Sequence, residues 1–180
     1  CLGGLEQASF TPARGDLEVV GSWLVINDTY NASPAAVKAS LDELVQVAEH
    51  EGRRAVAVLG DMLELGPQTG RFHREIGVYA AQRGVQMLWG VGPLAQATVE
   101  GFRNEVGDKA VVGHVDSPSD FQPLCMSLRP RDVILFKASR SLKLEKMVEL
   151  LRQTASELSS CRGSASASPG TSPDEAQKAG

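Results

Sequence analysis

Cysteines, aromatic side chains and long apolar runs are all scarce in this chain of 180 residues. The three cysteines are widely spaced and form no Cys-x-x-Cys pair, which argues against a disulfide framework or a zinc site and favours a reducing compartment. No apolar run reaches the ~18 residues that a membrane-spanning helix needs. The chain also has no excess of positive charge, since 18 Lys+Arg stand against 22 Asp+Glu. We therefore expect no membrane and no nucleic-acid partner.

What remains is the composition of one globular domain, with 42% hydrophobic and 22% charged residues. Residues 1–13 are weakly patterned, and we expect them to be a lead-in from an upstream domain. Residues 159–180 are almost all Ser, Ala, Gly, Pro and charged residues, with no large apolar side chain to bury. We expect this stretch to be a disordered tail, because nothing in it offsets the entropy cost of ordering. The domain itself should span residues 14–158.

Within that domain, short apolar segments alternate with segments of helical periodicity. The expected strands are Trp23–Asp28, Ala55–Gly60, Gln86–Val91, Ala110–Val115 and Asp132–Lys137. The expected helices are Ala35–His50, Gly70–Gln82, Leu94–Arg103, residues 117–128 and Leu142–Leu158. This alternation predicts a Rossmann-like α/β fold, with a mostly parallel sheet of about five or six strands and helices on both faces.

Polar residues gather where three of these strands end, in residues 27–34, 60–66 and 137–141. Ligands of open parallel sheets bind at the carboxyl ends of the strands. Helix N-termini and cations at that edge suit an anion, and a neighbouring acid suits a ribose hydroxyl or a metal. The same residue types also serve as turn residues, helix caps and solvated charges. The pattern alone therefore predicts a small-anion or nucleotide site and leaves the reaction open.

Three segments at this edge carry a more specific signal. They read NDTYNASPAAVKASLDEL, VAVLGDMLELG followed by His73, and ILFKASRSLKLEKMVELL. Together they resemble the C-terminal domain of the Mur ligase family over roughly Gly4 to Leu151. The YNASP and LGDMLELG blocks are most similar to the branch of the family that adds D-alanyl-D-alanine to UDP-N-acetylmuramoyl-tripeptide.

The resemblance implies an ATP-dependent amide-forming reaction in peptidoglycan precursor synthesis, in which a peptide carboxylate becomes an acyl phosphate that an amine attacks. It implies ATP and Mg²⁺, held mostly by a central P-loop domain, and a first domain that binds the UDP-sugar. The C-terminal domain would close over ATP and the dipeptide. The resemblance further implies a monomer in the cytoplasm, or in a plastid if the source is a photosynthetic eukaryote.

Site residues follow from the same resemblance, position by position. Those expected near the nucleotide, with Asp28 on the ribose, are Asp28, Tyr30, Asn31, Pro34 and Arg14. Those expected on the substrate side are Asp61, Glu64, His73, Lys137, Ser139 and Arg140. No catalytic residue and no metal ligand is expected in this chain alone. Two departures stand out: Arg14-Gly15 reverses the family's order, and Ala138 replaces a family glycine, which is costly only if φ is positive there.

A P-loop needs Gly-Lys followed by Ser or Thr, yet none of the lysines follows a glycine. We therefore expect the chain alone to be inactive as a ligase. Three alternatives stay open at this point. They are a folylpolyglutamate synthase-like domain, a stand-alone nucleotide- or dipeptide-binding module, and a non-catalytic partner of a separate ATPase subunit. The YNASP and LGDMLELG blocks count against the first.

Overall fold

The computed structural model describes residues 16–107 and 110–164, which form one mixed β-sheet flanked by helices. The strand order in this described part is β1-β2-β6-β3-β4-β5. The strands are β1 (Asp16–Val20), β2 (Trp23–Asp28), β3 (Ala55–Gly60), β4 (Met87–Val91), β5 (Val111–Val115) and β6 (Val133–Lys137). Only β1 pairs antiparallel, with β2, and all the other neighbours are parallel. The expected Rossmann-like α/β fold is confirmed.

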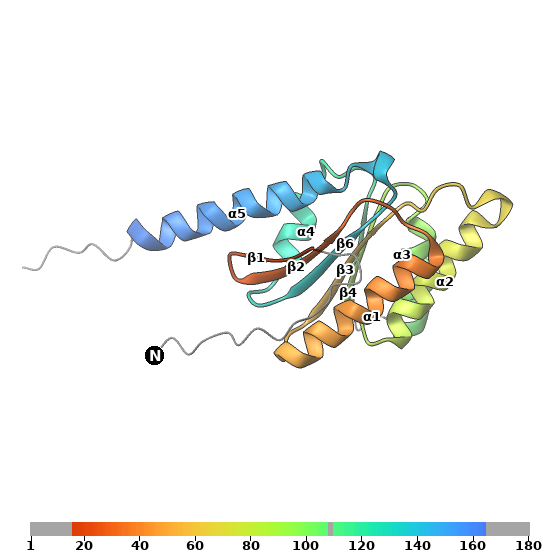
Figure 1. The fold of residues 1–180 in the computed structure, drawn as a ribbon, viewed down its shortest axis with the longest axis horizontal. Coiled ribbons are helices and arrows are strands. Elements are labelled where there is room, and N and C mark those ends of the chain that lie inside the picture. Colours follow the sequence, from red (N-terminus) through yellow and green to blue (C-terminus); the bar gives the residue numbers. More distant parts are fainter. Residues whose placement is uncertain (1–15, 108–109, 165–180) are drawn as a thin grey trace, which may run out of the picture.

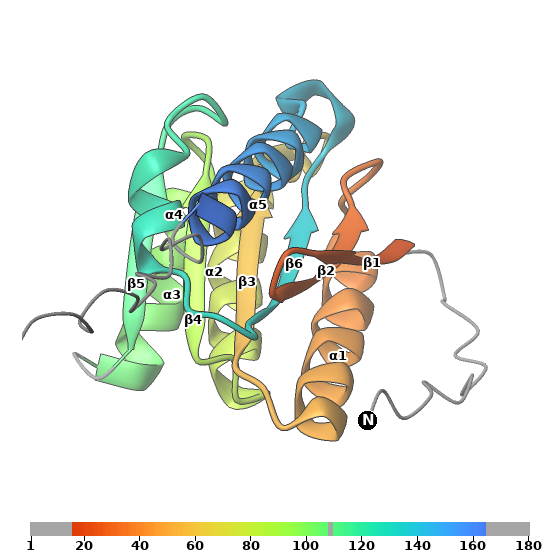
Figure 2. The same ribbon diagram turned by 90° about the vertical axis from the view of Figure 1, so that its left-hand side faces the viewer.

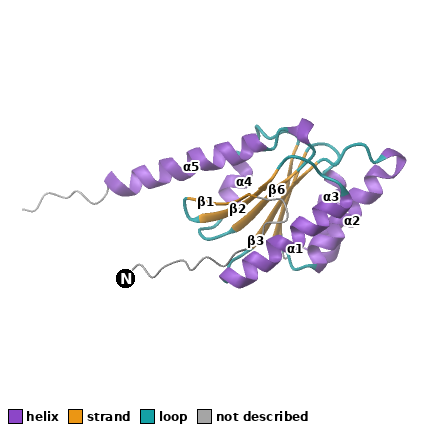
Figure 3. Ribbon diagram, in the orientation of Figure 1, coloured by secondary structure: helices purple, strands orange, loops and turns teal. Residues whose placement is uncertain are grey.

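Helices cover both faces of the sheet (Figures 1 and 3). Along the chain they are α1 (Pro34–Glu51), α2 (Thr69–Gln82), α3 (Gln96–Val106), α4 (Gln122–Ser127) and α5 (Glu145–Ser164), with two 3₁₀ turns, η1 (Gly66–Gln68) and η3 (Arg140–Leu142). One apolar cluster joins α1, α2 and α3 to one face, and a second joins α4 and α5 to the other. Figure 2 shows α5 crossing in front of the strands. Within the described ranges, no helix has the length and apolarity to cross a membrane.

The first helix shows how local sequence sets an element's ends. Ser33 is its N-cap, and the Ser33 side chain accepts a hydrogen bond from the Ala36 amide at 3.3 Å. Pro34 follows at the first helical position, where a missing N–H costs nothing. Gly52 ends the helix in the left-handed region, with φ of 59°. The sequence at both ends of α1 thus sets where the helix begins and where it stops.

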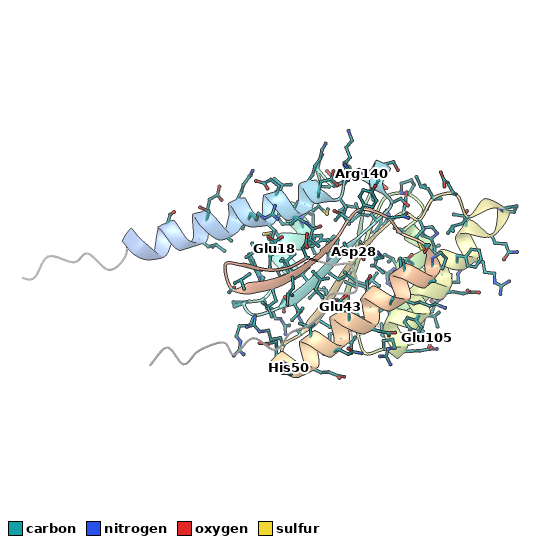
Figure 4. The ribbon with its side chains drawn as sticks, viewed as in Figure 1. Glu18, Asp28, Glu43, His50, Glu105 and Arg140 are labelled. Atoms are coloured by element: carbon teal, nitrogen blue, oxygen red, sulfur yellow. The ribbon has the colours of Figure 1, made fainter. Side chains whose placement is uncertain are left out.

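Strand β1 was not predicted, because its sequence DLEVV carries little of the apolar pattern of a buried strand. It is an edge strand whose Leu17 and Val19 side chains are exposed, and only its Val20 is buried. It pairs with β2 along its whole length, and Arg152 of α5 also binds Glu18 at 2.7 Å. Figure 4 labels Glu18 on this strand.

The last helix corrects the expected boundary of the tail. Residues 159–164 continue α5 as helix, where a disordered segment was expected. Backbone hydrogen bonding propagates along a helix that is already anchored, and Leu151 and Ala155 anchor α5 in the apolar cluster beneath it. Residues 165–180, the lead-in at 1–13 and Arg14 lie outside the described residues.

Candidate functional site

Three loops meet at the carboxyl edge of the sheet, as the sequence predicted. Strand β6 lies between β2 and β3, so the loops after these three strands are neighbours in space although they are far apart in sequence. The register places Lys137 of β6 opposite Asp28 of β2 and opposite Leu59 of β3. In Figure 4, Arg140 marks this edge, and His50 marks the opposite end of α1.

A buried ion pair lies at the centre of the site. Lys137 Nζ donates to Asp28 Oδ2 at 2.5 Å, and the two side chains are 2% and 12% exposed. Ser40 of α1 donates to the same carboxylate oxygen at 2.8 Å, and Lys137 also donates to the Asn31 carbonyl at 2.9 Å. In the part of the chain that the structure describes, no group hydrogen-bonds to Asp28 Oδ1. One oxygen of this fixed carboxylate is thus left to accept a hydrogen bond.

A second acid stands close to this pair. Glu43 lies one turn after Ser40 on α1, and burial raises its pKa, with the negative charge of Asp28 adding to the shift. The cation of Lys137 acts in the opposite direction. Lys137 therefore pairs with Asp28 and, through its charge, also favours the ionised form of Glu43.

The exposed part of the site is built from the loops after β2 and β6. The Tyr30 side chain is 72% exposed, and the Arg140 guanidinium carbon lies 5.2 Å from the centre of its ring. Asn31 is exposed as well, and its side-chain oxygen accepts from the Ala32 amide at 2.8 Å. An exposed aromatic ring under a cation offers a flat surface for a base or another planar group.

In the loop after β3, Asp61 is buried. Its Oδ1 accepts from the Ala95 amide at 2.8 Å, next to the start of α3. Burial raises the pKa of Asp61, and the hydrogen bond from Ala95 acts against that rise. Gly92 covers the carboxylate with φ of 99°, and a Cβ there would lie 2.7 Å from its atoms. Asp61 is therefore enclosed by the β4–α3 loop rather than presented at the surface.

His73 and Ser139 are also buried and hydrogen-bonded. His73 Nε2 accepts from the Met62 amide at 3.0 Å, and Nδ1 lies 2.8 Å from the Thr69 carbonyl. Ser139 Oγ accepts from the Leu63 amide at 3.0 Å. Both ring nitrogens of His73 therefore have backbone partners, and the residue is fully buried.

The predicted site residues thus fall into two groups. The side chains without a hydrogen bond to a residue distant in sequence, within the described part of the chain, are Tyr30, Asn31, Pro34, Glu64 and Arg140, and the side chains with such a bond are Asp28, Asp61, His73, Lys137 and Ser139. Sequence reasoning missed Ser40 and Glu43. Ser40 could have been noticed, because it is a polar residue on the apolar stripe of α1 beside Val37, Leu41 and Leu44.

The alanine in place of the family glycine fits without strain. Ala138 is not among the described residues with positive φ, and its side chain is fully buried. Space for it comes from Gly60, where an added Cβ would lie 2.6 Å from that of Ala138. The loop after β6 therefore keeps an ordinary backbone at this position.

The mostly parallel sheet, with polar loops collected at its carboxyl edge, defines an α/β domain of the Rossmann-like class. Residues 17–140 match the family model described as Mur ligase, glutamate ligase domain. The chain belongs to this family.

Its similarity extends to named ligases and solved structures. The chain is 35% identical over 147 residues to a UDP-N-acetylmuramoyl-tripeptide–D-alanyl-D-alanine ligase of Bacillus subtilis, which covers 81% of the chain and 32% of that protein. It is 29% identical to the ligase of the same name from Escherichia coli, over 83% of the chain and 32% of that protein. The structure of a MurF ligase from Thermotoga maritima in complex with ADP matches with a TM-score of 0.66 and 26% identity, over 84% of the chain and 33% of that one. The chain thus spans about a third of the length of these relatives.

Proposed function

We propose that this chain is the C-terminal domain of an ATP-dependent ligase that adds D-alanyl-D-alanine to UDP-N-acetylmuramoyl-tripeptide in the cytoplasm. The names of its relatives support this proposal, since the ligases matched carry that activity in their names. The proposed role of the domain is to close over ATP and the dipeptide. The remaining two-thirds of such a ligase would hold the ATP phosphates and the UDP-sugar.

The observation that carries the proposal is the free oxygen of Asp28. Lys137 and Ser40 fix the carboxylate through Oδ2 alone, which leaves Oδ1 as an acceptor at the carboxyl edge. A carboxylate oxygen held in this way suits a ribose hydroxyl, which donates a hydrogen bond. The exposed ring of Tyr30 lies two residues further along and suits stacking by the adenine base.

The reaction proposed for the whole enzyme has two steps. An oxygen of the peptide carboxylate bonds to the γ-phosphorus of ATP, and the bond to the bridging oxygen breaks, which releases ADP and leaves an acyl phosphate. The amine of D-alanyl-D-alanine then bonds to the acyl carbon, phosphate leaves, and the nitrogen loses a proton. In both steps, the proposed role of the residues of this chain is to bind and orient the reactants. Correct placement of the reactants lowers the barrier to reaction.

Magnesium, which the family implies, does not fit the residues described here. No group of three or more His, Cys, Asp or Glu side chains in residues 16–107 and 110–164 is arranged to hold a metal ion. Asp28 is neutralised by Lys137, and Asp61 is enclosed by the β4–α3 loop. We therefore assign no step through a metal to this domain.

Calorimetric titration of the isolated chain with ATP tests the assignment of the phosphate contacts. We expect a folded protein that binds ATP only weakly, because most of those contacts belong to the rest of the ligase. Binding at micromolar affinity or tighter would contradict this division of roles and would favour a stand-alone nucleotide-binding module. ADP serves as the matched ligand, since loss of the γ-phosphate should change the affinity little if this domain mainly holds the nucleoside.

A further inference from the structure

Two buried side chains hold consecutive backbone amides of the turn after β3. His73 accepts from the amide of Met62, and Ser139 accepts from the amide of Leu63. The amide of Ser139 donates in turn to the carbonyl of Asp61 at 3.0 Å. The turn is therefore tied to the loop after β6 by two hydrogen bonds in opposite directions, and to α2 by a third.

The hydrogen bonds of His73 also fix its tautomer. A backbone N–H must donate to Nε2, so Nε2 carries no proton. A carbonyl oxygen must accept from Nδ1, so Nδ1 carries the proton. Either the other tautomer or the doubly protonated ring would set a donor against the Met62 amide. The contact thus requires one protonation state of the ring.

The residue that follows these amides is Glu64, which is exposed and has a φ of 62°. A residue with a side chain is strained in this left-handed region, at a position where glycine would relieve the strain. Such a conformation persists where the surrounding structure holds it, and here the hydrogen bonds on Met62 and Leu63 do so.

We propose that His73 and Ser139 are positioning residues, which fix the turn Asp61–Glu64 and thereby hold the Glu64 carboxylate at the site for the ammonium group of the incoming amine. The role given to Glu64 rests on the proposed ligase function, whereas the fixing of the turn does not. Neither His73 nor Ser139 contacts the substrate in this account. Substitution of either residue should therefore change the KM for the dipeptide and leave the KM for ATP unchanged.

Amide hydrogen exchange in the 180-residue chain tests the fixing of the turn directly. His73→Asn keeps a donor near the Nδ1 position and loses the acceptor for Met62, so exchange of the Met62 amide should rise about tenfold, as loss of one hydrogen bond implies. His73→Gln keeps an acceptor near the Nε2 position and should leave Met62 protected. Ser139→Ala should raise the exchange rate of the Leu63 amide in the same way. Ser139→Thr and the exposed control Ser119→Ala should leave that rate unchanged. Unchanged exchange of Met62 in His73→Asn and of Leu63 in Ser139→Ala would overturn the proposal.

A measurement on the unaltered chain covers the case in which a variant fails to fold. Nitrogen-15 NMR of the imidazole should show a protonated Nδ1 and an unprotonated Nε2 for His73, and the opposite tautomer would overturn the assignment. In the complete ligase, Ser139→Ala should raise KM for D-alanyl-D-alanine about tenfold, with KM for ATP unchanged and with recovery in Ser139→Thr. An unchanged dipeptide KM would overturn the link to Glu64. A wild-type enzyme without dipeptide-dependent turnover would instead refute the proposed function, and the exchange result would still decide whether the turn is fixed.

Discussion

Replacing Lys137 by methionine tests whether the buried ion pair holds the site together. The variant keeps much of the side-chain volume and removes the charge from a position that is 2% exposed, which leaves Asp28 without its cation. Removing one partner of a buried pair typically costs about 3–5 kcal/mol. Each kcal/mol lowers Tm by roughly 2–4 °C in a domain of this size. We therefore expect Lys137→Met to lower Tm by about 6–20 °C, measured by circular dichroism.

The exposed Lys146 on α5 supplies the matched control, and Lys146→Met should change Tm by no more than a degree or two, since the described structure gives its side chain no partner. The double variant Asp28→Asn/Lys137→Met removes both charges and keeps an acceptor for Ser40. It should be more stable than the sum of the single losses predicts, by about 1 kcal/mol or more. A loss below about 1 kcal/mol in Lys137→Met, or strictly additive losses in the double variant, would refute the reasoning.

Two further predictions concern pH and packing. Burial raises the pKa of Asp61 above its ordinary 3.8, so the folded chain binds this proton more tightly and loses stability as the pH rises from about 4 through the raised pKa. Asp61→Asn keeps an acceptor for Ala95 and should flatten that slope in urea titrations, and an unchanged slope would refute the assignment. A Cβ on Gly77 of α2 would lie 2.0 Å from the Thr98 carbonyl of α3, so Gly77→Ala should cost about 2 kcal/mol. Gly70 has open space in the same helix, so Gly70→Ala should cost nothing, and equal costs would contradict the packing argument.

Much of the fold could be predicted because its strands are buried on both faces and read as short apolar runs. The predicted and observed bounds agree to the residue for Trp23–Asp28 and Ala55–Gly60. Strand β1 could not be found in this way, since an edge strand with exposed Leu17 and Val19 side chains lacks the apolar run of a buried strand. The end of α5 was predicted at Leu158, whereas the helix continues to Ser164. The polar composition after Leu158 does not show where a helix that is already anchored will stop.

The meeting of the three loops was predictable, because the carboxyl ends of parallel strands lie at one edge. The sequence did not show which polar side chains would face inward. His73 and Asp61 are bound by the Met62 and Ala95 amides, and no residue pattern shows that a loop will fold over a neighbouring side chain. Many residues of the motifs that carry the family resemblance are therefore buried, and they hold the loops that present the few exposed side chains.

The most direct test of the account is phosphate release by the complete ligase, with UDP-N-acetylmuramoyl-tripeptide, ATP and D-alanyl-D-alanine as substrates. Asp28→Asn keeps the shape of the side chain and removes the charge, and Asp116→Ala, at the exposed end of the same sheet edge, is the control. The account predicts dipeptide-dependent phosphate release by the wild type and by the control, and a strong loss in Asp28→Asn through a raised KM for ATP. Turnover that does not depend on the dipeptide, or unchanged ATP kinetics in Asp28→Asn, would contradict it.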